Sequence, residues 1–200
     1  MNKKIIILEG ADQCGKTQLS MYLQNIYFNG KCHVLHSNYS NSLPKKNHYN
    51  QHKLMTKFAI KLFKNKYYTG NNGIIFDRNY ISDIVYGNIG YGSGGSNKHK
   101  LKKLSRFLSK LDKHCKDTSI YIIYCNPTIE NFNVETKEEL LNKSQNSKIR
   151  EEYSKFFNNI KFLNILVKNH ITLLTYDFIV DPKYKELVKY LNLDWRFSND

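Results

Sequence analysis

A glycine-rich loop near the start of the chain constrains the fold more than any other feature of the sequence. An apolar run, Ile5–Leu8, leads into the loop Gly10–Thr17 (GADQCGKT), and an amphipathic helical pattern extends over Lys16–Asn29. The spacing of the two glycines, the lysine and the threonine is that of a phosphate-binding P-loop, and a strand before it and a helix after it are the context that this motif requires. We therefore predict a strand–loop–helix unit whose backbone N–H groups point towards phosphate oxygens.

Further apolar runs alternate with helical patterns along the chain. Short runs without polar alternation, typical of parallel strands covered on both faces, occur at Cys32–Leu35, Gly73–Phe76, Ile120–Tyr124 and Ile171–Leu174. Helical patterns occur at Lys100–Lys116, from Ile149 to Leu163, and from Tyr184 to Leu191. This alternation predicts an α/β fold, a three-layer sandwich with a parallel sheet of about five strands flanked by helices. Ligands of such folds bind at the carboxyl ends of the strands.

The length and the N-terminal residues indicate one domain without a membrane segment. The chain has 200 residues, with no internal repeat and no break in composition, so we expect a single domain over residues 1–200. The first apolar run ends after four residues, at Glu9, which is too short for a signal core or a membrane span. The cysteines show no spacing typical of zinc sites or disulfide frameworks. We expect a cytoplasmic protein without a membrane partner.

The charge balance is strongly basic. The chain contains 31 Lys and Arg against 17 Asp and Glu, a formal net charge of +14. An excess of this size favours polyanionic partners through release of counterions. The richness in Lys, Asn, Ile and Tyr is also what an AT-biased genome produces, so the charge leaves a nucleic-acid partner open.

Two polar stretches follow predicted strands. Ser37–His52 follows the second strand, and Gly87–Lys100 (GNIGYGSGGSNKHK) is rich in glycine and serine. We expect both to be mobile loops over the binding face, although a plain surface connection would have the same composition.

The P-loop predicts the nucleotide contacts. We expect the triphosphate of ATP to lie against Gly10, Ala11, Asp12, Gln13, Cys14, Gly15, Lys16, Thr17 and Gln18. Lys16 would reach the β- and γ-phosphates, and the Thr17 hydroxyl would be a ligand of Mg²⁺. Cys14 serves as a small residue inside the loop, although the helix N-terminus would also lower the pKa of its thiol.

Two motifs resemble one enzyme family. The run ILEGADQCGKTQL resembles the opening of thymidylate kinases and their nucleoside-kinase relatives, whose loop commonly reads EGxDxxGK[ST]. The run Asp77–Tyr86 (DRNYISDIVY) looks like the DRYxxSxxAY segment of that family. The runs SIYIIYCNPT and KIREEY are similar to a later strand and to the helix after the lid, so the resemblance extends over most of the chain.

The resemblance implies a binding site for a deoxynucleotide acceptor. Asp12 would bind the sugar 3′-hydroxyl, and Tyr86 would pack on the sugar and disfavour a 2′-hydroxyl. Ser82 and Asp83 complete the substrate-binding positions, although Asp83 stands where a neutral residue often reads the base. Arg78 would clamp the acceptor phosphate, which suits its planar fork of donors.

The resemblance also implies the catalytic groups. Asp77 would orient water bound to Mg²⁺, so the predicted metal-binding residues are Thr17 and Asp77, and the predicted catalytic residues are Lys16, Asp77, Arg78 and Arg150. Family members supply a transition-state cation either at the loop position held here by Gln13 or from a closing lid. The lid would be residues 143–150 (KSQNSKIR), with Arg150 its only arginine and Lys143 and Lys148 weaker candidates.

Four functions stay open at this point. The default is a deoxynucleoside monophosphate kinase with thymidylate as acceptor. A deoxynucleoside kinase and a kinase of hydroxymethylpyrimidine bases in viral DNA, acting in a host cytoplasm, are alternatives, because His36-Ser37-Asn38-Tyr39 replaces the REPG-like segment of the family. A non-catalytic nucleotide-binding module is a minor alternative, because Lys16 and Thr17 are both present. The expected partner is a small nucleotide, and helix-mediated homodimers of relatives leave a homodimer open.

Overall fold

The computed structural model describes residues 3–37, 45–64, 72–89, 96–128 and 143–193. Its centre is a five-stranded, entirely parallel sheet in the order β2-β3-β1-β4-β5. All five predicted strands are present, as β1 Lys3–Glu9, β2 Cys32–His36, β3 Gly73–Asp77, β4 Thr118–Cys125 and β5 Ile171–Tyr176. Because β1 lies between β3 and β4, the loop that follows β1 lies at the middle of the carboxyl edge.

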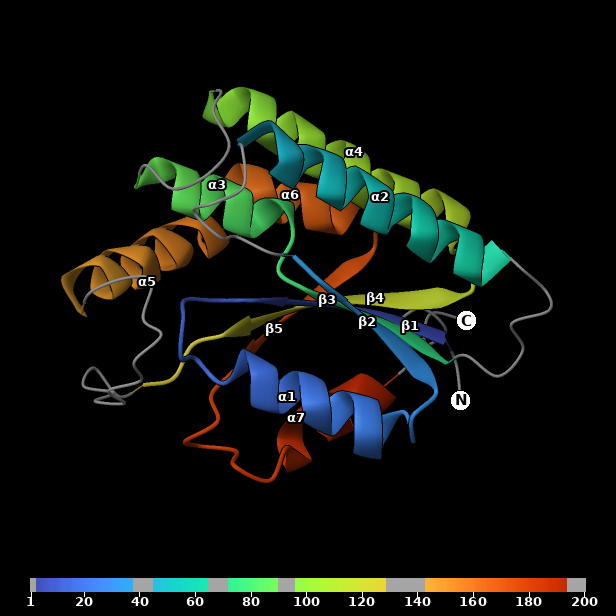
Figure 1. The fold of residues 1–200 in the computed structure, drawn as a ribbon. Coiled ribbons are helices and arrows are strands. Elements are labelled where there is room, and N and C mark those ends of the chain that lie inside the picture. Colours follow the sequence, from blue (N-terminus) through green and yellow to red (C-terminus); the bar gives the residue numbers. More distant parts are fainter. Residues whose placement is uncertain (1–2, 38–44, 65–71, 90–95, 129–142, 194–200) are drawn as a thin grey trace.

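Helices cover both faces of this sheet (Figure 1). One face carries α1 Lys16–Tyr22 and α7 Lys185–Asn192, and the other carries α2 Lys45–Lys64, α3 Tyr80–Asn88, α4 Asn97–His114 and α6 Ile160–Lys168. Helix α5 Lys143–Phe157 packs beside α3 and α6. The predicted α/β three-layer sandwich is confirmed.

The central strand divides its side chains between two hydrophobic layers. Ile5 and Ile7 face the layer under α2, α3 and α4, whereas Ile6 and Leu8 face the layer under α1 and α7. All four are at most 1% exposed. Burial of each such side chain contributes about 1.5–3 kcal/mol, which explains why this run shows no polar alternation.

The prediction of a loop over residues 37–52 was wrong for residues 45–52, because α2 begins at Lys45. Met55, Ala59 and Leu62 form the apolar stripe of this helix, and the polar residues before them continue the same helix. His52 is completely buried, and its Nδ1 lies 3.1 Å from the Ser37 hydroxyl. A histidine that packs in the core looks like a loop residue in the sequence. Residues 38–44 lie outside the described residues.

The predicted loop over residues 87–100 is also shorter than expected. Gly87 and Asn88 complete α3, and α4 begins at Asn97. The Ser96 side chain accepts a hydrogen bond from the His99 N–H, which is the usual way in which a serine starts a helix. The remaining part of the prediction, residues 90–95, lies outside the described residues.

Two predicted helices differ in their course. The pattern over Lys16–Asn29 forms α1 followed by a π-helical turn, η1 Leu23–Tyr27, and Gly30 then adopts the expected left-handed conformation with φ 71°. The pattern from residue 149 to residue 163 is divided between α5 and α6. Asn159 caps α6 by accepting a hydrogen bond from the Lys161 N–H, at 2.9 Å.

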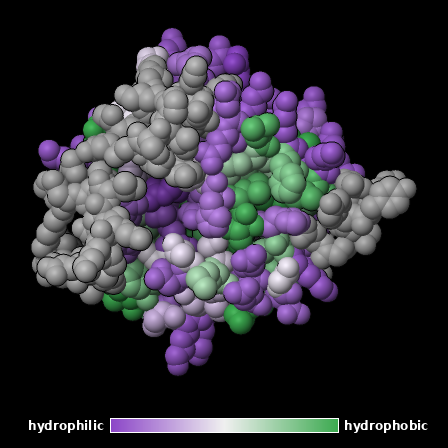
Figure 2. Space-filling view, in the orientation of Figure 1, coloured by the Kyte–Doolittle hydropathy of each residue, from purple (hydrophilic) through white to green (hydrophobic). Residues whose placement is uncertain are grey.

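The surface carries both hydrophilic and apolar areas. Figure 2 shows hydrophilic side chains over much of the described face and an apolar area near its middle. Leu54 and Phe58 of α2 are among the exposed apolar side chains, at 65% and 44%. Within the described ranges, no helix combines the length and the apolar character needed to span a bilayer.

Gly73 tests the packing between β3 and the helical turn that precedes β2. A Cβ at this position would lie 2.5 Å from the ring of Phe28, which is buried. We expect Gly73→Ala to lower the free energy of unfolding in urea by about 1–3 kcal/mol, because the added methyl overpacks the core. Phe28→Leu should rescue part of this loss in the double variant. Additive losses in the double variant would contradict the direct clash.

Candidate functional site

The sheet register places the two sequence motifs side by side. Leu8 of β1 pairs with Asp77 of β3, and the Arg78 N–H donates to the Leu8 carbonyl at 3.0 Å. On the other side, Glu9 pairs with Tyr124 of β4. The P-loop and the Asp77-Arg78 segment therefore leave the carboxyl edge of the sheet next to each other, as the position of ligand sites in parallel sheets requires.

Both P-loop glycines are required by their backbone conformation and their surroundings. Gly10 has φ 146°, and a Cβ there would lie 2.5 Å from the Cys125 carbonyl oxygen and 2.7 Å from the Cys14 sulfur. Gly15 has φ 81°, and a Cβ there would lie 2.8 Å from the ring of Phe178. The loop can curl around an anion only with glycine at these two positions.

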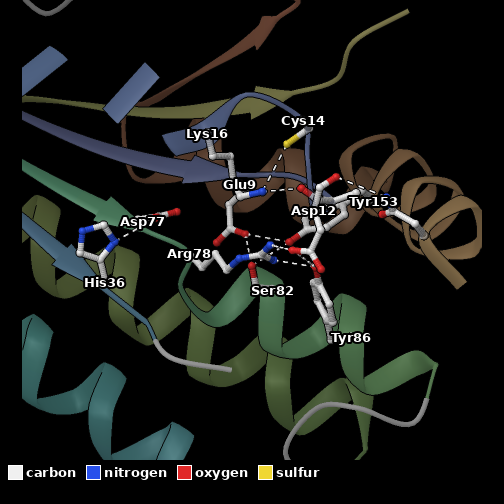
Figure 3. Close-up of polar contacts among 12 residues, drawn as sticks. Glu9, Asp12, Cys14, Lys16, His36, Asp77, Arg78, Ser82, Tyr86 and Tyr153 are labelled. Carbon is white, nitrogen blue, oxygen red and sulfur yellow. Dashed lines mark hydrogen bonds and ion pairs between the residues drawn. The ribbon is translucent and has the colours of Figure 1, made fainter. Parts of the chain in front are cut away.

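The Lys16 side chain lies inside the loop. It is 6% exposed, and its ammonium donates hydrogen bonds to the Ala11 carbonyl and, at 3.3 Å, to the Cys14 sulfur (Figure 3). Thr17 and Gln18 follow in the first turn of α1 and are exposed. The loop itself thus holds the ammonium group, through one carbonyl oxygen and one sulfur.

The sulfur of Cys14 is part of this electrostatic arrangement. Burial alone would raise the pKa of the Cys14 thiol, but a hydrogen bond from Cys125 and the nearby Lys16 ammonium lower it to about 6. The sequence had suggested a lowered pKa from the helix N-terminus. The structure adds Cys125, which stands at the end of the neighbouring strand.

Asp12, Arg78 and Tyr86 form one cluster beside the P-loop (Figure 3). The Arg78 guanidinium forms a hydrogen-bonded ion pair with the Asp12 carboxylate and donates to the Tyr86 hydroxyl at 2.7 Å. Tyr86 in turn donates to Asp12 at 3.2 Å, and the guanidinium lies 5.0 Å from the centre of the tyrosine ring. The structure brings together three residues that the sequence placed in the acceptor site.

The backbone of Arg78 is strained. Its φ is 66°, in the left-handed region that non-glycine residues seldom adopt. This conformation turns the side chain out of the direction of β3 and towards Asp12 and Tyr86. Strain of this kind persists where the surrounding contacts overdetermine it, and it is concentrated at functional sites.

Glu9 is the residue that the sequence reasoning left without a role. It is the last residue of β1 and completely buried, and its carboxyl group accepts hydrogen bonds from the Asn79 N–H at 2.8 Å, the Tyr153 hydroxyl at 3.1 Å and the Ser82 hydroxyl. Burial raises the pKa of Glu9 from 4.5 to about 7, although these hydrogen bonds and Arg78 oppose the shift. The signal in the sequence that could have indicated this role was the position of the glutamate directly before the first P-loop glycine.

The same network accounts for Ser82. Its hydroxyl is completely buried and contacts Glu9 and, at 2.7 Å, the Tyr153 hydroxyl. Asp83 is also buried, at 4% exposure, and its carbonyl accepts a hydrogen bond from Lys100 of α4 at 3.3 Å. Both residues are packed within α3 and its neighbours. Their contact with a substrate stays a prediction.

Asp77 has one bonded and one unbonded carboxylate oxygen. Its Oδ2 lies 2.9 Å from Nδ1 of His36, at the end of β2. Its Oδ1 is buried and has no hydrogen-bond partner among the described residues. An unpaired buried carboxylate oxygen is costly, and it marks a position where a cation or its bound water would fit.

Helix α5 reaches the P-loop from the side. Asn146 donates from its side-chain amide to the Asp12 carbonyl, at 3.4 Å, a contact that the sequence did not reveal. Residues 143–150, which the resemblance assigned to a lid, form the first half of this helix. Arg150 is half-buried near Tyr124, where burial raises the pKa of the tyrosine to about 12 and the arginine charge opposes that rise.

Solved structures with the same fold bind nucleotides. The YorR protein from Bacillus subtilis, in complex with phosphorylated GDP, has 15% identity and a TM-score of 0.53 over 94% of this chain and 93% of its own. Deoxyadenosine kinase from M. mycoides, with bound dATP, has 12% identity and a TM-score of 0.51 over 94% and 99%. The chain has a P-loop kinase fold.

A thymidylate kinase from Ehrlichia chaffeensis is also similar, with 17% identity and a TM-score of 0.45 over 96% of this chain and 100% of its own. No protein-family model and no curated protein sequence matches the chain. At these identities the likeness concerns the fold. The kinase fold nevertheless agrees with the resemblance seen in the two motifs.

Glu9 gives this P-loop kinase fold a pH-dependent stability. The unfolded carboxyl loses its proton near 4.5 and the folded one near 7, so between these values the folded state binds more protons and its stability falls as pH rises. This shift corresponds to a change of about 3 kcal/mol in the free energy of unfolding. We expect Glu9→Gln to remove this dependence and to be the more stable protein above pH 7.

The measurement is the free energy of unfolding in urea for both proteins at the two ends of this pH range. The difference between the two proteins isolates the contribution of Glu9 from that of every group that they share. Curves that stay parallel over the whole range would show that folding does not change the pKa of Glu9.

Proposed function

We propose that this chain transfers the γ-phosphoryl group of ATP, with Mg²⁺, to a deoxynucleoside monophosphate, with thymidylate as the default acceptor. The observation that carries the proposal is the cluster of Asp12, Arg78 and Tyr86 directly beside the P-loop. A phosphate-binding loop needs a second anion site at its side if the acceptor is itself phosphorylated. Arg78 provides such a site.

The chemistry of the cluster suits a deoxynucleotide. The guanidinium of Arg78 carries more donors than its contacts to Asp12 and Tyr86 use, so it can bind a phosphate while these contacts hold its direction. The Asp12 side chain is 37% exposed and can accept a hydrogen bond from a sugar hydroxyl. The bulk of Tyr86 beside it would disfavour an additional hydroxyl on the sugar.

The residues at the P-loop fit a magnesium ion that the nucleotide itself helps to bind. Within the described part of the chain, no group of three or more His, Cys, Asp and Glu residues could hold a metal alone. Mg²⁺ is usually bound by one or two protein groups, waters and substrate phosphates, and Thr17 with the unpaired Asp77 Oδ1 would supply the protein share. When bound, the ion neutralises charge on the β- and γ-phosphates.

The protein's own contribution is position and charge. Phosphoryl transfer needs little covalent chemistry, so the rate depends on alignment and on cations near the transferring group. The Lys16 ammonium group is held by the P-loop itself. Gln13, at the loop position where some relatives of the resembled family have an arginine, brings no charge. Arg150 of α5 is the second cation of the proposal, because α5 contacts the P-loop through Asn146.

The acceptor is tested with purified protein, labelled ATP and Mg²⁺. The panel contains thymidylate, the other deoxynucleoside monophosphates, deoxynucleosides and DNA that contains hydroxymethyluracil. We expect transfer to monophosphates, with thymidylate preferred. Transfer to nucleosides or to DNA alone would replace the acceptor in this proposal, and binding of ATP without any transfer would favour a non-catalytic module.

Arg78→Lys separates phosphate recognition from catalysis. A lysine keeps the charge but loses the planar fork, so we expect the KM for the acceptor nucleotide to rise at least about tenfold while the KM for ATP changes little. Lys16→Ala is the matched comparison, because it should weaken ATP and abolish turnover. An acceptor KM that Arg78→Lys leaves unchanged would contradict a role for Arg78 in binding the acceptor phosphate.

Arg150→Ala tests the source of the second cation. We expect kcat to fall at least about tenfold with little change in fold, because the proposed role of the arginine is to stabilise charge on the transferring group. Lys155→Ala is the control on the same helix, since Lys155 is exposed and paired with Glu151 at 2.8 Å. Equal kcat values for the two variants would remove Arg150 from the mechanism.

A further inference from the structure

A groove lies between α2 and α4, which run side by side in the helical layer opposite α1 (Figure 1). Its volume is about 710 Å³. The residues that line it are Lys53, Thr56, Lys57, Ile60, Lys61, Lys64, Tyr80, Lys103, Arg106, Phe107, Lys110 and His114. None of the functions considered above uses this groove.

The walls of the groove are cationic. Among the described residues that line the groove, every ionisable side chain is a lysine, an arginine or a histidine, apart from Tyr80, and none is a carboxylate. On α2 the lysines follow each other at intervals of three or four residues, which places them in one row along the helix. Figure 2 shows hydrophilic side chains projecting along the upper edge of the molecule, where Figure 1 places α2 and α4.

The positive field also acts on the histidine at the end of the groove. Partial burial, followed by the charges of Lys64, Lys113 and Lys110, holds the pKa of His114 below its ordinary value. Lys64 ends α2 and Lys110 belongs to α4, so the two helices direct their charges to one space. A cluster of like charges of this kind is stabilised by an anionic ligand.

The floor of the groove is apolar. Ile60 of α2 is half-buried, and Phe107 of α4 packs against Tyr80 with ring centres 5.3 Å apart. Phe107 and Tyr80 are 3% and 6% exposed, so the floor offers a ligand a small apolar area beside the charged walls. The groove therefore fits a ligand with a charged edge and a flat or apolar edge.

We propose that this groove binds single-stranded nucleic acid. The row from Lys53 to Lys64 covers eleven residue steps of helix, about 16 Å at 1.5 Å per residue. This length corresponds to about five stacked nucleotides at 3.4 Å each, a usual site size for single-strand binding. The lysines contact the phosphates, and the apolar floor contacts the bases.

Other anions fit this space less well. One inorganic phosphate or one free nucleotide neutralises only a few of the cations that are spread over this length. A second copy of the chain would place the same cationic rows against each other. A strand of nucleic acid brings a regular series of negative charges together with flat bases, which matches both the walls and the floor.

This inference does not rest on the proposed kinase activity. The groove lies in the helical layer that faces away from α1, and the lysines of its walls belong to α2 and α4 rather than to the P-loop. Tyr80, one of the residues of the floor, is two residues after Arg78, so a bound strand would approach the candidate acceptor site.

The test is fluorescence anisotropy of a labelled oligothymidylate of about 20 nucleotides, titrated with the full chain at several salt concentrations. The groove variant is Lys57→Glu with Lys110→Glu, and Lys57→Gln with Lys110→Gln is the milder form. The matched control is Lys168→Glu with Lys183→Glu, which changes the net charge equally at exposed positions outside the groove. Circular dichroism confirms that all variants are folded.

We expect the groove variant to bind the strand at least about tenfold more weakly. The slope of log K against log salt concentration should become less steep by about 1.4, because two phosphate contacts are lost. The control should bind almost as the unchanged protein does. Equal losses in both variants would overturn the proposal, because binding would then follow net charge alone. Stronger binding of duplex DNA, or full displacement by polyglutamate, would also overturn it. Phosphoryl transfer to free nucleotides should be the same in all variants. If the kinase assay fails, the result of the binding experiment still stands, because strand binding is measured without turnover.

Discussion

The buried carboxyl group of Glu9 is the contact on which the candidate site depends. It ends β1, and it binds the backbone at the start of α3 and the hydroxyl of Tyr153 in α5. Three elements that are distant in the sequence thus meet at one carboxyl group directly below the P-loop. Burial disfavours the ionised carboxylate and raises its pKa to about 7. The hydrogen-bond donors around it oppose this rise, because they stabilise the ionised form.

Beside this contact, the charged groups that would bind a substrate are already held by other groups of the protein. Arg78 is directed by a left-handed backbone and held by Asp12 and Tyr86, and Lys16 is held by the loop that it would serve. Such groups need little rearrangement when an anion arrives, and prearranged charge is the largest contribution that a protein makes to phosphoryl transfer. The unpaired oxygen of Asp77 is consistent with a site completed by a cation.

The strongly basic composition also has a spatial pattern. Much of the excess positive charge that the described structure locates is on α2 and α4, where two rows of cations face one groove with an apolar floor. A solvated surface would distribute these charges over all exposed faces. Their concentration around one groove therefore favours an anionic partner at this place. The composition alone could not separate a nucleic-acid partner from a genomic bias, because it carries no information about position.

The sequence alone determined the fold class, all five strands and the P-loop, because these are local patterns: apolar runs, helical periodicity and glycine spacing. It also selected Asp12, Arg78 and Tyr86, through motif positions that the structure brings into contact. The start of α2 and the break before α6 were missed, because a buried histidine and a capping asparagine look like loop residues until their neighbours are known. Only the tertiary structure decided that Glu9 is buried, that Ser82 points to it, and that lysines 50 positions apart form one groove. These properties depend on the parallel register of β1 and on the packing of α2 against α4, and both arise from contacts between residues far apart in the chain.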